Sequence, residues 1–356
     1  MAGMSAADKL WQTQFTMADI FRRAQGDVFE LFGLGPRECE HHVISSGPHW
    51  RLREYTCQYP DAAILIVPAP IKRPYVWDLA PSVSAVRHCL DHRLRVYLLE
   101  WMPPSGNTQR AGLEDHADRA ISKCVASISS EMQGARPFLM GHSLGGTLAA
   151  MFCALEQQSV RGLVLLATPL SFAPGSSKFR DALVSLVPQM ALGAEIVPGS
   201  ILSHVSALAS PNTFVWARLM DAALGIIDPP TFEICARVER WALDEVPLPG
   251  PLVSEIVQLL YRENRFCRGI LSIRDRALGP SCMQVPTLAI VNTADEIAPL
   301  DSVKPFLDAM PKKTTRIIEY PGEAGIGLQH LALLVGRQAH ARVWPEIVSW
   351  LRTGRL

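Results

Sequence analysis

A serine stands between two glycines at 141–145, in the stretch Gly-His-Ser-Leu-Gly. The residues Pro-Phe-Leu-Met before it suit a strand, and the small and apolar residues after it suit a helix. A sharp turn from a strand into a helix requires small flanking residues and exposes the serine Oγ at the helix N-terminus, where backbone N–H groups can stabilise an oxyanion. The pattern therefore predicts that Ser143 is a nucleophile, and not the serine of an ordinary tight turn.

A serine hydroxyl is a weak nucleophile at neutral pH, so it needs a base that an acid holds in place. Two later segments supply these groups after strand-like runs. Asp295 follows TLAIVN, and His330 comes after TTRIIEYPG and a short loop. The order serine, acid, histidine, with each residue in a loop after a strand, is typical of this turn. Ser143, Asp295 and His330 are therefore the predicted catalytic residues.

Other acids and histidines near these positions have simpler interpretations. Glu296 adjoins Asp295 but should point elsewhere, and Asp301 suits the N-cap of a helix. His340 lies too far into the last helical segment to reach the site. We expect His142, inside the turn, to pack beside the site instead of transferring protons.

An oxyanion hole needs two hydrogen-bond donors. The first is expected to be the backbone N–H of Leu144, directly after the nucleophile. The second should come from the loop VPAPIKRP at 67–74, in which the prolines have no N–H to donate. Either Ala69 or Ile71 must then donate, and we favour Ile71.

Short apolar runs alternate with helical patterns over much of the chain. Several runs are continuously apolar, which suits strands that helices cover on both faces. This alternation predicts an α/β domain with a mostly parallel central sheet flanked by helices. The eight candidate strands are HVISS, WRLREYTCQY, AAILIVPAP, LRVYLLEWM, RPFLMG, RGLVLLATP, PTLAIVN and TTRIIEYPG.

The alternation stops between the sixth and seventh of these strands, where the pattern becomes helical. We expect residues 170–283 to form a helical cap inserted into an α/β core of residues 39–169 and 284–356. Residues 1–38 have apolar positions at helical spacing and predict a helical segment that lies against the core.

The composition excludes some functions and compartments. The chain of 356 residues has a formal net charge of zero, which gives no electrostatic reason to expect nucleic acid as a partner. The N-terminus lacks a positive start followed by an apolar core, and the apolar runs are too short to span a bilayer. The eight cysteines form no C-x-x-C pair and are expected to be reduced thiols. We therefore expect a cytoplasmic protein with no transmembrane segment that needs no metal or organic cofactor.

The segment at 65–101 resembles the core of polyhydroxyalkanoate synthases. In that family an apolar strand, a proline-containing turn, a Y-x-x-D-L-x-P segment and a strand that ends in Trp occur in the same order. The stretches GLGPRE at 33–38, NRFCRGILSIRDRALGPSCMQVPTLAIVNTADEIAP at 264–299 and LQHLALLVG at 328–336 also match the family. The resemblance implies an α/β-hydrolase fold and places the catalytic acid at Asp295 and the base at His330.

The chain departs from that family at the centre of the turn, where the synthases have Cys and this sequence has Ser143. A serine acyl-enzyme is an ordinary oxoester, which water can discharge. Together these features imply a serine hydrolase that cleaves an ester or thioester of an acyl substrate, such as a 3-hydroxyacyl ester, oligomer or acyl-CoA. Two alternatives remain, a synthase-like acyltransferase that uses Ser143 and a non-catalytic binding protein on the same fold. Apolar cap helices would also allow a homodimer.

Overall fold

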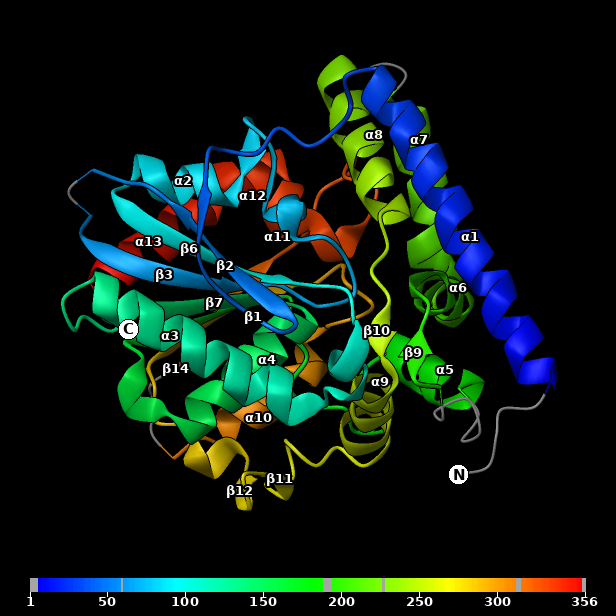
Figure 1. Cartoon of the computed structure of the whole chain (residues 1–356). Coiled ribbons are helices and arrows are strands. Elements are labelled where there is room, and N and C mark those ends of the chain that lie inside the picture. Colours follow the sequence, from blue (N-terminus) through cyan, green and yellow to red (C-terminus); the bar gives the residue numbers. More distant parts are fainter. Residues whose placement is uncertain (1–5, 59, 188–193, 226–227, 312–314, 354–356) are drawn as a thin grey trace.

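An eight-stranded sheet forms the centre of the computed structural model, which describes residues 6–58, 60–187, 194–225, 228–311 and 315–353 (Figure 1). The strand order is β1-β2-β6-β3-β7-β8-β13-β14. β2 runs antiparallel to both of its neighbours, and every pair from β6 to β14 is parallel. The predicted mostly parallel sheet is confirmed, and the eight predicted strands form it. Their bounds are β1 (His42–Gly47), β2 (Trp50–Tyr55), β3 (Ala62–Val67), β6 (Leu94–Trp101), β7 (Phe138–His142), β8 (Gly162–Leu166), β13 (Thr287–Asn292) and β14 (Thr315–Tyr320).

Helices cover both faces of the sheet, as Figure 1 shows. The central strands β3, β7, β8 and β13 are buried at every position, because alternate side chains enter apolar clusters on opposite faces. One face carries η3 (Asp115–Ala120), α3 (Ile121–Glu131), α4 (Leu144–Leu155) and α10 (Lys304–Asp308). The other face carries α2 (Ala85–Asp91), α11 (Ala332–Val335), α12 (Arg337–Arg342) and α13 (Trp344–Thr353), beside the short pair β4 (Asp78–Ala80) and β5 (Val83–Ser84).

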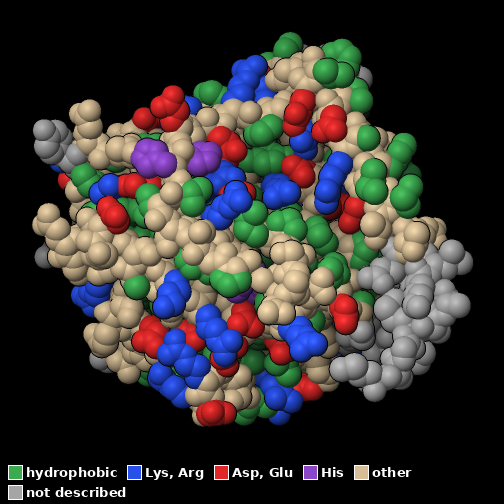
Figure 2. Space-filling view, in the orientation of Figure 1, with side chains coloured by type: hydrophobic (Ala, Val, Ile, Leu, Met, Phe, Trp, Pro, Cys, Tyr) green, Lys and Arg blue, Asp and Glu red, His purple; other side chains and the backbone are tan. Residues whose placement is uncertain are grey.

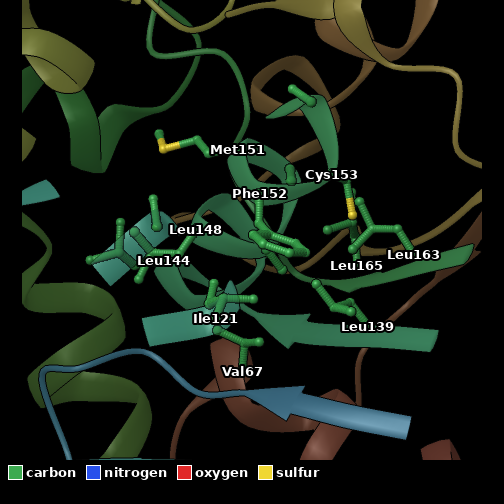
Figure 3. Close-up of a cluster of buried hydrophobic side chains, with 14 of the residues drawn as sticks. Val67, Ile121, Leu139, Leu144, Leu148, Met151, Phe152, Cys153, Leu163 and Leu165 are labelled. Carbon is green, nitrogen blue, oxygen red and sulfur yellow. The ribbon is translucent and has the colours of Figure 1, made fainter. Parts of the chain in front are cut away.

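The helix after Ser143, α4, is buried along its whole length. Figure 3 shows its side chains packed against Val67 of β3, Leu139 of β7, Leu165 of β8 and Ile121 of α3. A close-packed helix of this kind cannot shift without disturbing several strands. The core therefore fixes the position of the turn at Ser143.

The cap segment, residues 170–283, lies between β8 and β13 in the chain. It is largely helical, but its described residues also include the short strand pairs β9–β10 and β11–β12. Its described elements are α5 (Lys178–Leu186), β9 (Ile196–Val197), α6 (Gly199–Ala209), η6 (Asn212–Trp216), α7 (Ala217–Gly225), α8 (Pro229–Leu243), β10 (Leu248–Pro249), α9 (Gly250–Glu255), η7 (Ile256–Arg262), β11 (Leu271–Ile273), β12 (Arg276–Leu278) and η8 (Pro280–Cys282).

The N-terminal helix α1 (Ala6–Leu31) lies along the cap segment, so the prediction that it packs against the core is wrong (Figure 1). The reason is polar: the Asp19 carboxylate accepts the backbone N–H groups of Gly199 and Ser200 at the start of α6, at 3.2 and 2.8 Å. A carboxylate there satisfies helix N–H groups that would otherwise have no partner. In the described part of the chain no helix, α1 included, is both long and apolar enough to cross a membrane.

Candidate active site

Ser143 lies where β7 ends and α4 begins. Its backbone has φ 54° and ψ −135°, a conformation that a residue with a side chain adopts only under strain. The surroundings hold it there. The Ser143 N–H donates to the carbonyl of Leu166 in β8 at 3.1 Å, and the Ser143 carbonyl accepts the N–H of Gly146 at 3.0 Å. The chain thus makes the sharp strand-to-helix turn that the sequence predicts.

The glycines around Ser143 are required by close backbone contacts. A Cβ on Gly141 would lie 2.4 Å from the Cα of Gly146, and a Cβ on Gly145 would lie 2.2 Å from the carbonyl oxygen of Val67. Backbone atoms cannot move aside as the end of a flexible side chain can. Glycine at these positions therefore lets α4 approach β3 and β7 closely.

Asp295 and His330 are hydrogen-bonded to each other. His330 Nδ1 donates to Asp295 Oδ2 at 2.6 Å, and the Ile297 N–H donates to the other carboxylate oxygen at 2.9 Å. Both side chains are buried, with 2% of Asp295 and 6% of His330 exposed. Because β13 and β14 are parallel neighbours, the loops after them meet at the same sheet edge as Ser143.

The second ring nitrogen of His330 is available as a base. Since Nδ1 carries the proton that bonds Asp295, a neutral imidazole has its lone pair on Nε2. This Nε2 is buried and has no hydrogen-bond partner among the described residues, so no hydrogen bond joins it to the Ser143 hydroxyl. Several buried polar atoms of the described residues lack a partner, among them His49 Nε2 and His88 Nε2, so the free Nε2 indicates a base only together with the bond to Asp295 on the same ring. Catalytic hydrogen bonds are often long before substrate binds.

His142 packs beside the site, as its place in the turn predicts. Its Nε2 donates to the backbone carbonyl of His330 at 2.7 Å, and the two rings have centroids 4.6 Å apart. Burial, together with the neighbouring His330, lowers the pKa of His142 to about 3. His142 is therefore neutral at neutral pH and ties the residue before Ser143 to the loop of His330.

The expected oxyanion donors lie on two different elements. Leu144 is the first residue of α4, and the first N–H groups of a helix have no acceptor within it. The backbone at Val67 and Ala69 packs against Gly145, and Trp101 Nε1 fixes this loop by donating to the Pro68 carbonyl at 2.8 Å. Ile71, farther along the loop, packs against the core, and its role as a donor stays a prediction.

The residue after Ile71, Lys72, joins this loop to the cap segment and to α1. Its Nζ lies 3.2 Å from both Ser203 Oγ and Glu245 Oε1, and Arg22 Nε lies 3.1 Å from Glu245 Oε2. Burial lowers the pKa of Lys72 to about 8, although Glu245 favours the charged form. Three segments far apart in the sequence thus meet at one buried carboxylate.

The two acids considered as alternatives to Asp295, Glu296 and Asp301, have other surroundings. Glu296 turns away from the pair, and its Oε2 accepts hydrogen bonds from Ser210 and Thr213 at 2.7 and 2.9 Å. Asp301 is exposed within η9 (Leu300–Ser302) and caps no helix, so its predicted N-cap role is wrong. The chain enters a short 3₁₀ turn there, and the following helix α10 starts after Val303.

Two residues near the site were not identified from the sequence. Asn292 donates through Nδ2 to the carbonyl of Gln329 at 2.8 Å and so holds the residue before His330. The available signal was a polar residue at the end of the otherwise apolar run TLAIVN. Asp221, in α7, binds backbone N–H groups of the loop that leads to His330, and no local pattern marks it.

Known proteins resemble the chain over most of its length. The pattern of the family described as alpha/beta hydrolase fold matches residues 74–326. The poly(3-hydroxyalkanoate) polymerase subunit PhaC of Haloferax mediterranei is 29% identical over 350 residues, which cover 96% of this chain and 69% of that protein. The subunit of the same name from Haloarcula marismortui is 27% identical over 82% of this chain and 60% of its own length.

A solved structure has the same architecture. The monoacylglycerol lipase of Paleococcus ferrophilus superposes with a TM-score of 0.51 and 17% sequence identity, over 85% of this chain and 98% of the lipase. At this identity the likeness concerns the arrangement of sheet and helices alone.

Proposed function

We propose that this chain, which belongs to the alpha/beta hydrolase fold family, is a serine hydrolase of acyl esters or thioesters. The observation that carries the proposal is the buried bond between Asp295 and His330, which leaves His330 Nε2 without a partner near the turn at Ser143. An acid, a base and a serine in these loops are what nucleophilic acyl transfer needs.

In the proposed reaction Ser143 Oγ attacks the carbonyl carbon of the substrate while His330 Nε2 takes the hydroxyl proton. Asp295 keeps the proton on Nδ1 and stabilises the imidazolium that forms. The Leu144 N–H and a second amide of the 67–74 loop bind the oxyanion. Collapse of the tetrahedral intermediate releases an alcohol or thiol, which takes its proton from His330. Water, deprotonated by His330, then attacks the acyl-serine, and the carboxylic acid leaves.

The substrate class is inferred from the relatives. Their names describe enzymes that polymerise 3-hydroxyalkanoates, so a 3-hydroxyacyl group as an ester, an oligomer or an acyl-CoA is the acyl group we propose. A serine in place of a thiol favours hydrolysis as the outcome, because its acyl-enzyme is an oxoester.

Acyl transfer is the second candidate function. The observation in its favour is the similarity to polymerase subunits over 96% of the chain. In that reaction the cap segment would exclude water, and a hydroxyl group of another hydroxyacyl unit would take the acyl group from Ser143. The product would then be a longer chain instead of a free acid.

Labelling with a fluorophosphonate, followed by intact-protein mass spectrometry, tests the proposal on wild type and Ser143→Ala. We expect one adduct on wild type and none on the variant. The same proteins are incubated with a 3-hydroxyacyl-CoA, and we expect wild type to release free acid and CoA. Chain growth in place of acid release would establish the transferase. A wild-type protein that neither labels nor turns over would contradict both functions and leave a non-catalytic binding protein.

A further inference from the structure

The loop that carries His330 has no regular structure of its own. Residues 321–328 connect β14 to the short helix η10 (Gln329–Leu331), and neither helix nor strand occurs within them. Gly325 and Gly327 have φ of 81° and 75°, a conformation that favours glycine. Contacts from other elements must therefore determine where this loop lies.

One carboxylate of the cap segment binds three consecutive N–H groups of this loop. The Gly325 N–H donates to Asp221 Oδ1 at 2.9 Å, and the N–H groups of Ile326 and Gly327 donate to Oδ2 at 3.2 and 2.8 Å. Backbone N–H groups that converge in this way form a nest for an anion. Only 7% of Asp221 is exposed, so water competes little for these bonds.

The cap segment also holds the loop that carries Asp295. Glu296, the next residue, accepts hydrogen bonds from Ser210 and Thr213, which lie between α6 and η6 or at the start of η6. The α/β core holds the part of the loop next to the histidine, through Asn292 to the Gln329 carbonyl and through His142 to the His330 carbonyl.

We propose that Asp221 is a positioning residue for His330, and that the cap segment from Ser210 to Asp221 completes the Asp295–His330 pair by holding both of its loops. The inference rests on the proposed function, in which this pair activates Ser143. Its consequence is that the position of the base depends on the cap segment being seated on the sheet edge. A displacement of this segment would release the loop that carries the base.

The test compares Asp221→Asn with wild type, using p-nitrophenyl butyrate as the substrate. The amide cannot accept all three N–H groups, so we expect kcat to fall about 10- to 100-fold while KM changes less than about twofold. Asp181→Asn is the matched control. Asp181 is also a cap-segment carboxylate that accepts a backbone N–H, from Gly175, but that loop carries no catalytic residue. We expect its kcat to equal that of wild type.

Hydrogen exchange gives a second readout that does not depend on activity. The amides of 325–327 should exchange about tenfold faster in Asp221→Asn than in wild type, and at the wild-type rate in Asp181→Asn.

A second variant, with Ser210→Ala and Thr213→Val, removes the donors to Glu296 and should lower kcat about fivefold. This variant keeps the test decisive if Asp221→Asn does not fold.

Failure of the inference and failure of the proposed function give different results. If wild type hydrolyses neither p-nitrophenyl butyrate nor the 3-hydroxyacyl-CoA and takes up no fluorophosphonate, the proposed function fails, while slower exchange of the 325–327 amides in wild type than in Asp221→Asn still supports the contact. If wild type is active and the Asp221 and Ser210/Thr213 variants keep its kcat, the positioning role is overturned. A fall of kcat in Asp181→Asn equal to that in Asp221→Asn would overturn it as well.

Discussion

The hydrogen bond between His330 and Asp295 decides which ring nitrogen of His330 keeps a free lone pair. Because Nδ1 donates to a carboxylate with only 2% of its residue exposed, the imidazole cannot easily exchange its tautomer. The second carboxylate oxygen is held by the Ile297 N–H, so the acid cannot rotate freely either. The strained backbone of Ser143 completes the arrangement, since it keeps the hydroxyl at the start of α4.

His142 makes the stability of the protein depend on pH. Its folded-state pKa of about 3 lies below the ordinary value of 6.5, so between these values the unfolded chain binds a proton that the folded protein does not. The free energy of unfolding therefore falls as the pH drops below 6.5, by about 2 kcal/mol at pH 5 from this residue.

Urea unfolding at pH 8 and pH 5, on wild type and His142→Asn, measures that contribution. We expect wild type to lose about 2 kcal/mol more than the variant between the two pH values. Comparing the losses removes the contribution of other buried histidines such as His116, whose pKa burial lowers to about 4. Equal losses in the two proteins would show that His142 is not held neutral by the fold.

At the scale of elements, the junction of β3, β7 and α4 depends on glycine. In Gly145→Ala the new methyl group would meet the carbonyl oxygen of Val67 at 2.2 Å. We expect the free energy of unfolding to fall by about 3 kcal/mol, measured by urea titration, because backbone must move.

Gly35→Ala is the control for that substitution, since its methyl group meets only the flexible side chain of Glu30, at 3.1 Å. We expect a change within about 0.5 kcal/mol. Equal effects of the two substitutions would mean that the close approach of α4 to β3 is not what requires glycine at 145.

The sequence predicted the elements that have a local pattern. All eight strands of the sheet were identifiable, because buried strands are short apolar runs between turn residues. The loops of Ser143, Asp295 and His330 followed from them, because residues after parallel strands meet at one edge. The roles of these three residues remain a prediction.

The contacts made by the cap segment could not be predicted in this way. Asp221 reaches a loop about a hundred residues later, and helical spacing says nothing about which distant backbone a side chain will bind. The same reason explains why the predicted packing of α1 against the core was wrong. The apolar pattern of this helix does not say which apolar partner it will contact. Its polar contacts, such as Asp19 with the start of α6, favour the cap segment.

At the scale of the whole molecule, the 34 Lys and Arg residues balance the 34 Asp and Glu residues, so the formal net charge is zero. Figure 2 shows Lys and Arg side chains interspersed with Asp and Glu on the face it presents, with no patch of a single sign. One charged cluster lies inside, where Glu245, with 1% of its side chain exposed, joins Lys72 of the 67–74 loop to Arg22 of α1.

Replacing Glu245 should loosen three segments at once. In Glu245→Gln the charges of Lys72 and Arg22 lose their shared partner, and we expect the free energy of unfolding to fall by about 3 kcal/mol. The control is Glu346→Gln, which breaks a half-exposed surface pair with Arg316 and should cost less than about 1 kcal/mol. Thermal and urea unfolding of both variants measure the difference. A cost for Glu245→Gln as small as that of the control would contradict the central role of this carboxylate.

The sheet order has a consequence for synthesis of the chain. β8 pairs with β13, but the ribosome makes the whole cap segment between them. Until β13 emerges, β8 is an open edge of an apolar sheet, and such edges attract the strands of other nascent chains. The serine is also made long before its base, since residue 143 precedes residue 330. On the proposed mechanism, a growing chain cannot be acylated at Ser143 before His330 has been made, and by then both β13 and β14 are available to close this edge.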